Sequence, residues 1–365
     1  MVSQHLSKII SFLRFPLIVA VIFIHCNLTS VLPASHNNTV FSVLMHVTLS
    51  IVFQAVPIFF LISGYLFFKE QSFCLVLYFQ KLKKRFSTLL IPYVCWNIIY
   101  LIIIAFLQSI SPDFLFILHK RIADFSFTDY FWIFWDISKI TGMPDDQSAC
   151  IVGAFWFLQC LFVMCVISPL IYLLMKLFRH LFPLLLLIVY FSNIVPTMPG
   201  VHPQAIFYFS LGSFLSFYGI DFLYYIKKYI PLLTVMFVVL LFILYFNDNI
   251  QLYRLYELMM IVVFFYIVNY LVIEKKWQIG NSLVSCVFFV FGIHRLFTAA
   301  IMRLSTTTVP YISNDILLYV YYVLCVTLSV ILSVYSYRLL KLIMPHTAII
   351  LNGGKSCDCL SKNGN

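Results

Sequence analysis

Apolar segments about as long as a membrane-spanning helix recur along this sequence from residue 9 to residue 342, with no long polar block between them. A helix needs about 20 mostly apolar residues to cross the hydrocarbon core of a bilayer. Of the 365 residues, 63% are hydrophobic and only 10% are charged, which is far from the composition of a soluble domain. The sequence therefore predicts an all-α, polytopic membrane protein.

Hydropathy predicts about ten transmembrane helices. They run near residues 9–31, 42–68, 86–108, 152–175, 181–198, 203–219, 229–246, 253–273, 283–304 and 314–342. The fifth and sixth of these segments are short and are flanked by prolines. We expect one transmembrane domain at 1–344, followed by a short polar cytoplasmic tail at 345–365.

The distribution of basic residues predicts the orientation of these helices. Lys and Arg are enriched in cytoplasmic connections, and most of the 23 fall in the alternate set of connections that includes both chain ends. We therefore expect an even number of spans, both termini in the cytoplasm, and the longest loop, at 109–151, outside. This arrangement accounts for the net charge of +10 without a nucleic-acid partner, and it makes the lipid bilayer the main partner.

The first predicted span contains Arg14 and His25 in an otherwise apolar helix. Ionisable side chains are costly inside a membrane and are candidates for function. The two residues are about three turns apart, which places them on one helix face about 16 Å apart along the axis. An arginine can grip a phosphate, whereas a histidine can take a proton from a hydroxyl. The structural alternative is that Arg14 reaches the lipid headgroups and His25 bonds to a neighbouring helix.

Two later spans carry further polar or small residues. The second ends in Ser63, Gly64 and Tyr65, where the glycine allows a ligand or a helix to approach closely. The ninth carries His294 followed by Arg295, with the histidine near mid-depth. A second intramembrane histidine beside an arginine again requires a partner or a wet cavity.

Basic and aromatic residues near the membrane boundaries have simpler explanations. Lys84 and Arg85 end a basic run before the third span, where basic residues usually set orientation and contact anionic lipid. Trp156 opens the fourth span, and a tryptophan at that position is by default part of the aromatic belt. These patterns indicate a buried polar site, but they name no reaction.

Cysteine usage predicts no metal centre. The ten cysteines are scattered, mostly within apolar segments. Cys357 and Cys359 lie in the tail, but two thiolates supply only half of a usual zinc set. A reduced cytoplasmic tail and a modified one both remain open for this pair.

Several of these motifs, taken in order, make the chain resemble acyltransferase family 3, the bacterial membrane O-acyltransferases that modify surface glycans. The match rests on the pair Arg14 and His25, the Ser-Gly-Tyr-Leu at 63–66, Arg85 followed by Leu-Leu-Ile-Pro-Tyr at 89–93, the Trp-Phe-Leu at 156–158, and the late His294. It covers almost the entire chain.

The resemblance implies about ten helices and a location in the bacterial inner membrane. It also implies a cytoplasmic acyl-coenzyme A donor, usually acetyl-CoA, and a glycan or lipid-linked sugar as acceptor. His25 would be the catalytic base, and Arg14, Lys84 and Arg85 would lie on the donor side. His294, Trp156, Ser63 and Tyr65 would have supporting parts.

The chain departs from the family pattern at Gln159 and Cys160, where similar proteins often carry an Arg-Asp pair. Two rival functions also remain open. An arginine and two histidines within spans suit a transporter or flippase for a glycan precursor, and a relative without catalytic activity would act as an interaction protein.

Overall fold

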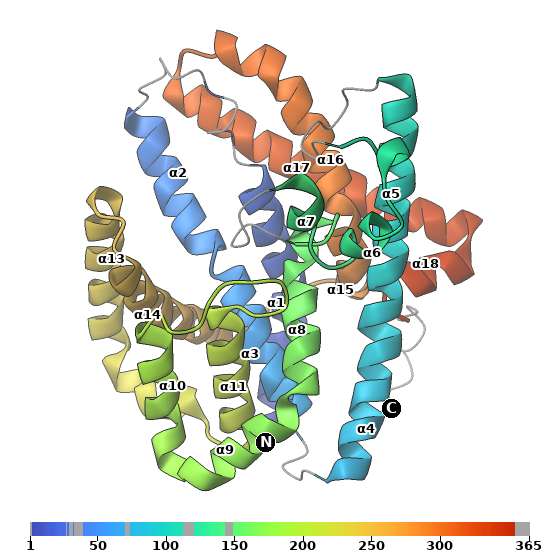
Figure 1. Cartoon of the computed structure of the whole chain (residues 1–365). Helices are drawn as coiled ribbons and strands as arrows, with labels where there is room; N and C mark the ends of the chain where they lie inside the picture. The colour runs from blue at the N-terminus through green and yellow to red at the C-terminus, as the bar shows by residue number, and fades with distance from the viewer. Residues whose placement is uncertain are drawn as a thin grey trace. The chain divides into compact units, whose positions relative to one another are not determined.

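The computed structural model describes residues 2–26, 28, 32, 39–69, 74–111, 120–142 and 149–354. In these ranges the chain forms helices joined by loops, as Figure 1 shows. The tail cysteines Cys357 and Cys359 lie outside the described residues. The described residues cluster into two compact units, one within 2–59 and 221–348, the other within 60–220 and 349–354. The single domain predicted at 1–344 remains a prediction.

The helices of the first unit are α1 (Val2–His25), α2 (Thr39–Val52), α12 (Phe222–Ile226), α13 (Ile230–Phe246), α14 (Ile250–Asn269), α15 (Asn281–Ser285), α16 (Val287–Thr308) and α17 (Asp315–Ile343). The second unit has α4 (Leu75–Arg85), α5 (Ile91–Ile110), α6 (Asp129–Trp132), α7 (Ser138–Thr141), α8 (Trp156–Val166), α9 (Ser168–Phe178), α10 (Phe182–Phe191) and α11 (Pro203–Phe217). Helices α3 (Ala55–Phe67) and α18 (Pro345–Leu351) each belong partly to both units.

Eight apolar helical segments in the described part of the chain are long enough to cross a membrane. They are Leu6–His25, Val40–Phe67, Leu75–Ile110, Ser168–Phe191, Phe222–Phe246, Ile250–Glu274, Val287–Tyr311 and Asp315–Ile343. The prediction of a multi-pass membrane protein is therefore confirmed. The predicted count of about ten spans is not confirmed, nor are the sides of the termini.

The fourth and sixth predicted spans correspond to short helices. The fourth, expected as one helix over 152–175, becomes the apolar segment Gly153–Val166 and a separate helix, α9, that begins at Ser168. The sixth corresponds to α11, which has 15 residues. Both α8 and α11 contain many buried side chains, so they form part of the core of the second unit.

Helix α1 lies at the centre of the first unit. It packs against α2, α14, α15, α16 and α17, and α16 and α17 also pack against each other (Figure 1). The buried residues of α1 are mainly Ile and Leu, including Ile9, Leu13, Leu17 and Ile22. Apolar contacts with five helices thus hold α1 in place within the first unit.

Two glycines bring α3 and α11 into close contact within the second unit. A Cβ added to Gly64 would lie 2.0 Å from the carbonyl oxygen of Phe209 on α11. A Cβ added to Gly212 would lie 2.0 Å from the carbonyl oxygen of Leu61 on α3. Each helix therefore presents a glycine to the backbone of the other, which is how helices approach closely in membranes. Of the two uses considered for Gly64, the structure shows the contact with a helix.

The described part of the loop predicted over 109–151 is anchored to the helices of the second unit. Tyr93 of α5 donates a hydrogen bond to the carbonyl of Phe134. The Nε2 of Gln159 on α8 donates to the carbonyl of Trp135 at 2.7 Å. The side chain at Gln159, where the sequence departs from the family pattern, thus has a structural role in holding this loop.

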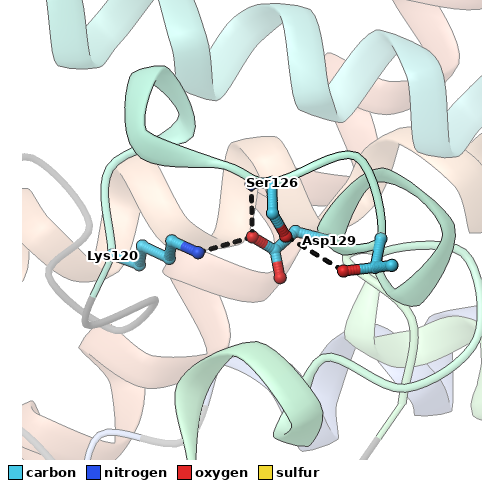
Figure 2. A network of polar contacts seen from close by, with 4 residues as sticks. Lys120, Ser126 and Asp129 are labelled. Carbon is cyan, nitrogen blue, oxygen red and sulfur yellow. Dashed lines mark hydrogen bonds and ion pairs between the residues drawn. The ribbon is translucent and has the colours of Figure 1, made fainter.

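An ion pair closes one turn of this loop (Figure 2). The Nζ of Lys120 lies 2.5 Å from Oδ2 of Asp129, which also accepts a hydrogen bond from the backbone N–H of Ser126 at 2.6 Å. The hydrogen bonds from Lys120 and Ser126 lower the pKa of Asp129 from 3.8 to about 2. The loop therefore gains stability from the ionised carboxylate.

This pKa shift predicts how the turn responds to pH. A depressed pKa contributes stability that is fully present above 3.8 and is lost as the pH falls toward about 2. Below pH 4 we expect tryptophan fluorescence to report loosening near Trp132 and Trp135. Asp129→Asn should loosen the turn already at neutral pH, whereas Asp124→Asn, at an exposed position in the same loop, should not. Identical fluorescence profiles for wild type and Asp129→Asn would contradict this account.

Candidate active site

His25 is the last residue of α1, and the end of that helix is tied to α17. The hydroxyl of Tyr322 donates a hydrogen bond to the carbonyl of Phe23 at 2.8 Å. Next to His25, the Sγ of Cys26 lies 3.6 Å from Oγ of Ser329. These contacts fix the last turn of α1, while the imidazole of His25 itself remains half-buried.

The imidazole of His25 contacts Arg295 on α16. Nη1 of Arg295 lies 3.2 Å from Nδ1 of His25. A guanidinium group can only donate hydrogen bonds, so Nδ1 of His25 must accept this one. In this arrangement His25 is neutral, with a lone pair on Nδ1 and its proton on Nε2. From the sequence, Arg295 was noted only as the residue that follows His294, and no role was predicted for it.

His294 is the second histidine of this cluster and is fully buried, with 0% of its surface exposed. Its ring centre lies 5.2 Å from that of His25, and the two rings are tilted by 37°. Nδ1 of His294 lies 2.8 Å from the carbonyl oxygen of Phe291. A carbonyl can only accept, so the proton of His294 is on Nδ1 and the lone pair is on Nε2. Among the described residues, this buried Nε2 has no hydrogen-bond partner.

Arg14 is half-buried and lies on the same uninterrupted helix as His25, about 16 Å from it along the axis. The part of α1 that precedes it, from Lys8 to Phe12, borders a cavity of about 390 Å³. The polar residues that line this cavity are Lys8, Ser11, Lys276, Trp277, Gln278 and Asn281. Lys276 has a φ of 55°, which is uncommon for a residue with a side chain.

Lys84 and Arg85 are in the last turn of α4, in the second unit. Lys84 is exposed and Arg85 is half-buried near Cys165 of α8. A π-helical segment, Phe86–Leu90, follows them, and such segments are frequent at functional sites. With α5 they form an apolar helix of 36 residues, Leu75–Ile110, which is much longer than a bilayer core requires.

The supporting residues Ser63, Tyr65 and Trp156 also belong to the second unit, where all three are half-buried. The ring of Trp156 lies 6.2 Å from that of Phe60 and 5.0 Å from that of His202, measured between centres. Sequence reasoning missed His202, which caps α11 through its Nδ1. Its position in the sequence, between Pro199 and Pro203, did not indicate this contact with Trp156.

The sequence-predicted residues thus divide between the two units. Arg14, His25 and His294 belong to the first unit, where the two histidines are neighbours. The other five predicted residues, namely Ser63, Tyr65, Lys84, Arg85 and Trp156, belong to the second. The proposed joint action of Arg14 with Lys84 and Arg85 therefore stays a prediction.

Two charged residues of α14 were not recognised as buried from the sequence. Arg254 is 7% exposed and Glu257 is 0% exposed, and Tyr253 lies beside the glutamate. The sequence did contain a signal. Arg254 and Glu257 are three residues apart, and side chains at that spacing share one face of a helix.

No group of three or more His, Cys, Asp and Glu side chains in the described ranges is arranged to hold a metal ion. Comparison with known protein families identifies the family of this chain. The model of acyltransferase family 3, described as an acyltransferase domain, matches residues 8–338, nearly the whole chain. No curated protein and no solved structure matches the chain.

Proposed function

Because the chain belongs to acyltransferase family 3 and is a membrane acyltransferase, we propose that it transfers an acetyl group from acetyl-CoA to a glycan hydroxyl. The donor is cytoplasmic, and the acceptor is an extracytoplasmic or lipid-linked glycan, such as an exopolysaccharide or an O-antigen. The protein would be located in the bacterial inner membrane, with both termini in the cytoplasm. The main support is the neutral histidine His25, held by Arg295 inside a chain that this family model covers.

In the proposed reaction His25 is the catalytic base. It takes the proton of the acceptor hydroxyl as the hydroxyl oxygen attacks the thioester carbonyl. The C–O bond of the ester forms, the C–S bond breaks, and the proton passes from His25 to the departing thiolate. The products are the acetylated glycan and free coenzyme A. Arg295, a donor next to His25, is placed to stabilise the negative charge that develops on the carbonyl oxygen.

The donor would bind at the cytoplasmic ends of the helices. Arg14, Lys84 and Arg85 would hold the phosphates of coenzyme A, since guanidinium and ammonium groups form charge-assisted bonds with phosphate. Lys8 and Lys276 add two further cations on the cavity beside α1. Ser63, Tyr65 and Trp156 would support the path of the acyl group.

Replacing Lys84 and Arg85 with glutamine is expected to weaken acyl-CoA binding, because two phosphate contacts are lost. The remaining binding should depend less on salt, since screening acts on those contacts. Direct titration of the purified protein with acyl-CoA at low and high salt measures both effects. As a control, Lys227 and Lys228, a basic pair in the first unit, are replaced in the same way. Unchanged affinity in the Lys84 and Arg85 variant would remove these residues from the donor site and leave them a role in orientation.

The alternative is a transporter or flippase for a glycan precursor. One observation favours it, because the buried Arg254 and Glu257 of α14 are charges of the kind found along substrate and ion pathways. The two functions differ in what happens to the thioester. A transporter leaves it intact, whereas a transferase releases free thiol.

Thiol release separates the two functions. Purified protein in lipid nanodiscs is incubated with acetyl-CoA and candidate acceptor glycans, and free coenzyme A is measured with a thiol reagent. We expect release that depends on the protein and increases with a suitable acceptor. If no acyl-CoA is cleaved with or without acceptor, while a glycan precursor crosses proteoliposomes, the transporter function is correct.

A further inference from the structure

The two histidines have complementary Nε2 atoms, one a donor and the other an acceptor. Arg295 occupies Nδ1 of His25, so Nε2 of His25 carries a proton and can donate it in a hydrogen bond. The Phe291 carbonyl occupies Nδ1 of His294, so Nε2 of His294 is an acceptor, and it is buried without a partner among the described residues. A buried acceptor without a hydrogen bond is costly and calls for an explanation.

From this arrangement we propose that His294 is the positioning residue of the base: its Nε2 accepts the Nε2 proton of His25 during the reaction. Nδ1 of His25 is then the nitrogen that takes the proton of the acceptor hydroxyl, after Arg295 releases it. This inference rests on the proposed acyl transfer and names the atoms that would perform it.

Burial determines which histidine meets the substrate. His294 is 0% exposed, whereas His25 is half-buried at the end of α1. Full burial excludes direct contact between His294 and a hydroxyl in this structure, and its neighbour His25 is the group it can act on. Because a buried histidine held by a backbone carbonyl keeps its tautomer, it can fix the tautomer and the direction of the next ring.

The distance between the rings allows this bond to form with little movement. The ring centres are 5.2 Å apart and the rings are tilted by 37°. No hydrogen bond joins them here, since Nε2 of His294 has no partner in the described part of the chain. A rotation of the His25 ring about its terminal side-chain bond, whose preferences are broad, would bring the two nitrogens into range. Arg295 restrains this rotation as long as it is bonded to Nδ1.

The acceptor hydroxyl would relieve that restraint. When it replaces Arg295 at Nδ1, its proton moves to Nδ1 while its oxygen bonds to the acyl carbon. Nη1 of Arg295 can then donate to the carbonyl oxygen, which becomes negative. His25 is now an imidazolium, and its Nε2–H is held by His294, which stays neutral throughout. The proton on Nδ1 leaves with the thiolate, and Arg295 returns.

The first test reads the protonation of the rings without turnover. The full chain, labelled with ¹⁵N-histidine in nanodiscs, is studied by NMR, and the signals are assigned with single histidine variants. We expect His25 to be protonated on Nε2 and His294 on Nδ1. A proton on Nδ1 of His25, or on Nε2 of His294, would overturn the inference, because the two Nε2 atoms could not then act as donor and acceptor.

The second test uses kinetics of the same variants. His294→Leu should lower kcat about 100-fold, as expected when a base loses its orientation, with KM for acyl-CoA nearly unchanged. His294→Gln should recover most of the rate. His46, an intramembrane histidine bonded at 3.1 Å to the Leu241 carbonyl, gives the control variant His46→Leu, expected to retain activity. Equal rates for the Leu and Gln variants at equal thermal stability would contradict a positioning role. A wild-type protein without transfer would instead refute the proposed function, and NMR would still decide the hydrogen-bond arrangement.

Discussion

Replacing His25 with alanine is expected to abolish acyl transfer, with a loss of about 10⁴-fold or more, the upper range for a general base. The variant loses the proton acceptor, and the methyl group that remains cannot replace it. Expression, membrane insertion and donor binding should stay close to wild type. The end of α1 is held by the bonds of Phe23 and Cys26 to α17, and these do not involve the imidazole. Transfer is measured as acetylated product from purified protein, together with acyl-CoA binding.

His46→Ala is the matched control for this variant, since it also removes a half-buried imidazole from an apolar helix. It should keep most of the activity. One result would contradict the assignment of the base: near-normal transfer by His25→Ala together with none by His294→Ala. The active centre would then be on α16, and α1 would only support it.

The second large effect is expected from Gly64→Ala in the contact between α3 and α11. The added Cβ would lie 2.0 Å from the Phe209 carbonyl oxygen, and the backbone on both sides prevents a small adjustment. The helices would have to separate, at a cost of about 3 kcal/mol or more, the upper range for overpacking. We expect a lower melting temperature in mild detergent and a smaller folded fraction.

Gly153→Ala provides the comparison for this substitution. Gly153 belongs to the same unit, and a Cβ there would meet nothing within 4 Å. Its melting temperature should stay within a few degrees of wild type. If Gly64→Ala melted at the same temperature as Gly153→Ala, the close approach of α3 and α11 would not be needed for stability.

Hydropathy was enough to predict the fold class, because a bilayer requires long apolar helices whatever their arrangement. It could not distinguish a span from a short buried helix. Helices α8 and α11 are apolar but have only 11 and 15 residues, and many of their side chains are buried inside the second unit. A membrane span and a buried helix are both rich in apolar residues. Hydropathy therefore shows that a segment avoids water, but not whether lipid or protein surrounds it.

The candidate site was predictable along one helix and unpredictable across helices. The spacing of Arg14 and His25 on α1 follows from helix geometry, and α1 is continuous over both residues. The contact of His25 with Arg295 and His294 joins helices that are far apart in the sequence. Such contacts depend on tertiary packing, of which one sequence carries no direct signal.

Gly64 illustrates the same limit at the level of one residue. A glycine in an apolar helix indicates that something approaches closely, but its neighbour in space is set by the partner helix. The structure identifies that neighbour as the backbone of Phe209, and the partner helix contributes Gly212 in return. The two glycines lie in different predicted spans, and nothing in the sequence around either glycine shows that the other lies opposite it.

The most direct measurement of the central claim follows the acyl group across a membrane. The protein is reconstituted in sealed proteoliposomes with acetyl-CoA, labelled in the acetyl group, on the side that carries the chain termini. The acceptor glycan is placed on the opposite side. The account predicts labelled glycan on the acceptor side, free coenzyme A retained on the donor side, and neither product with His25→Ala. Labelled glycan formed equally by His25→Ala, or a glycan that crosses the bilayer without being acetylated, would contradict it.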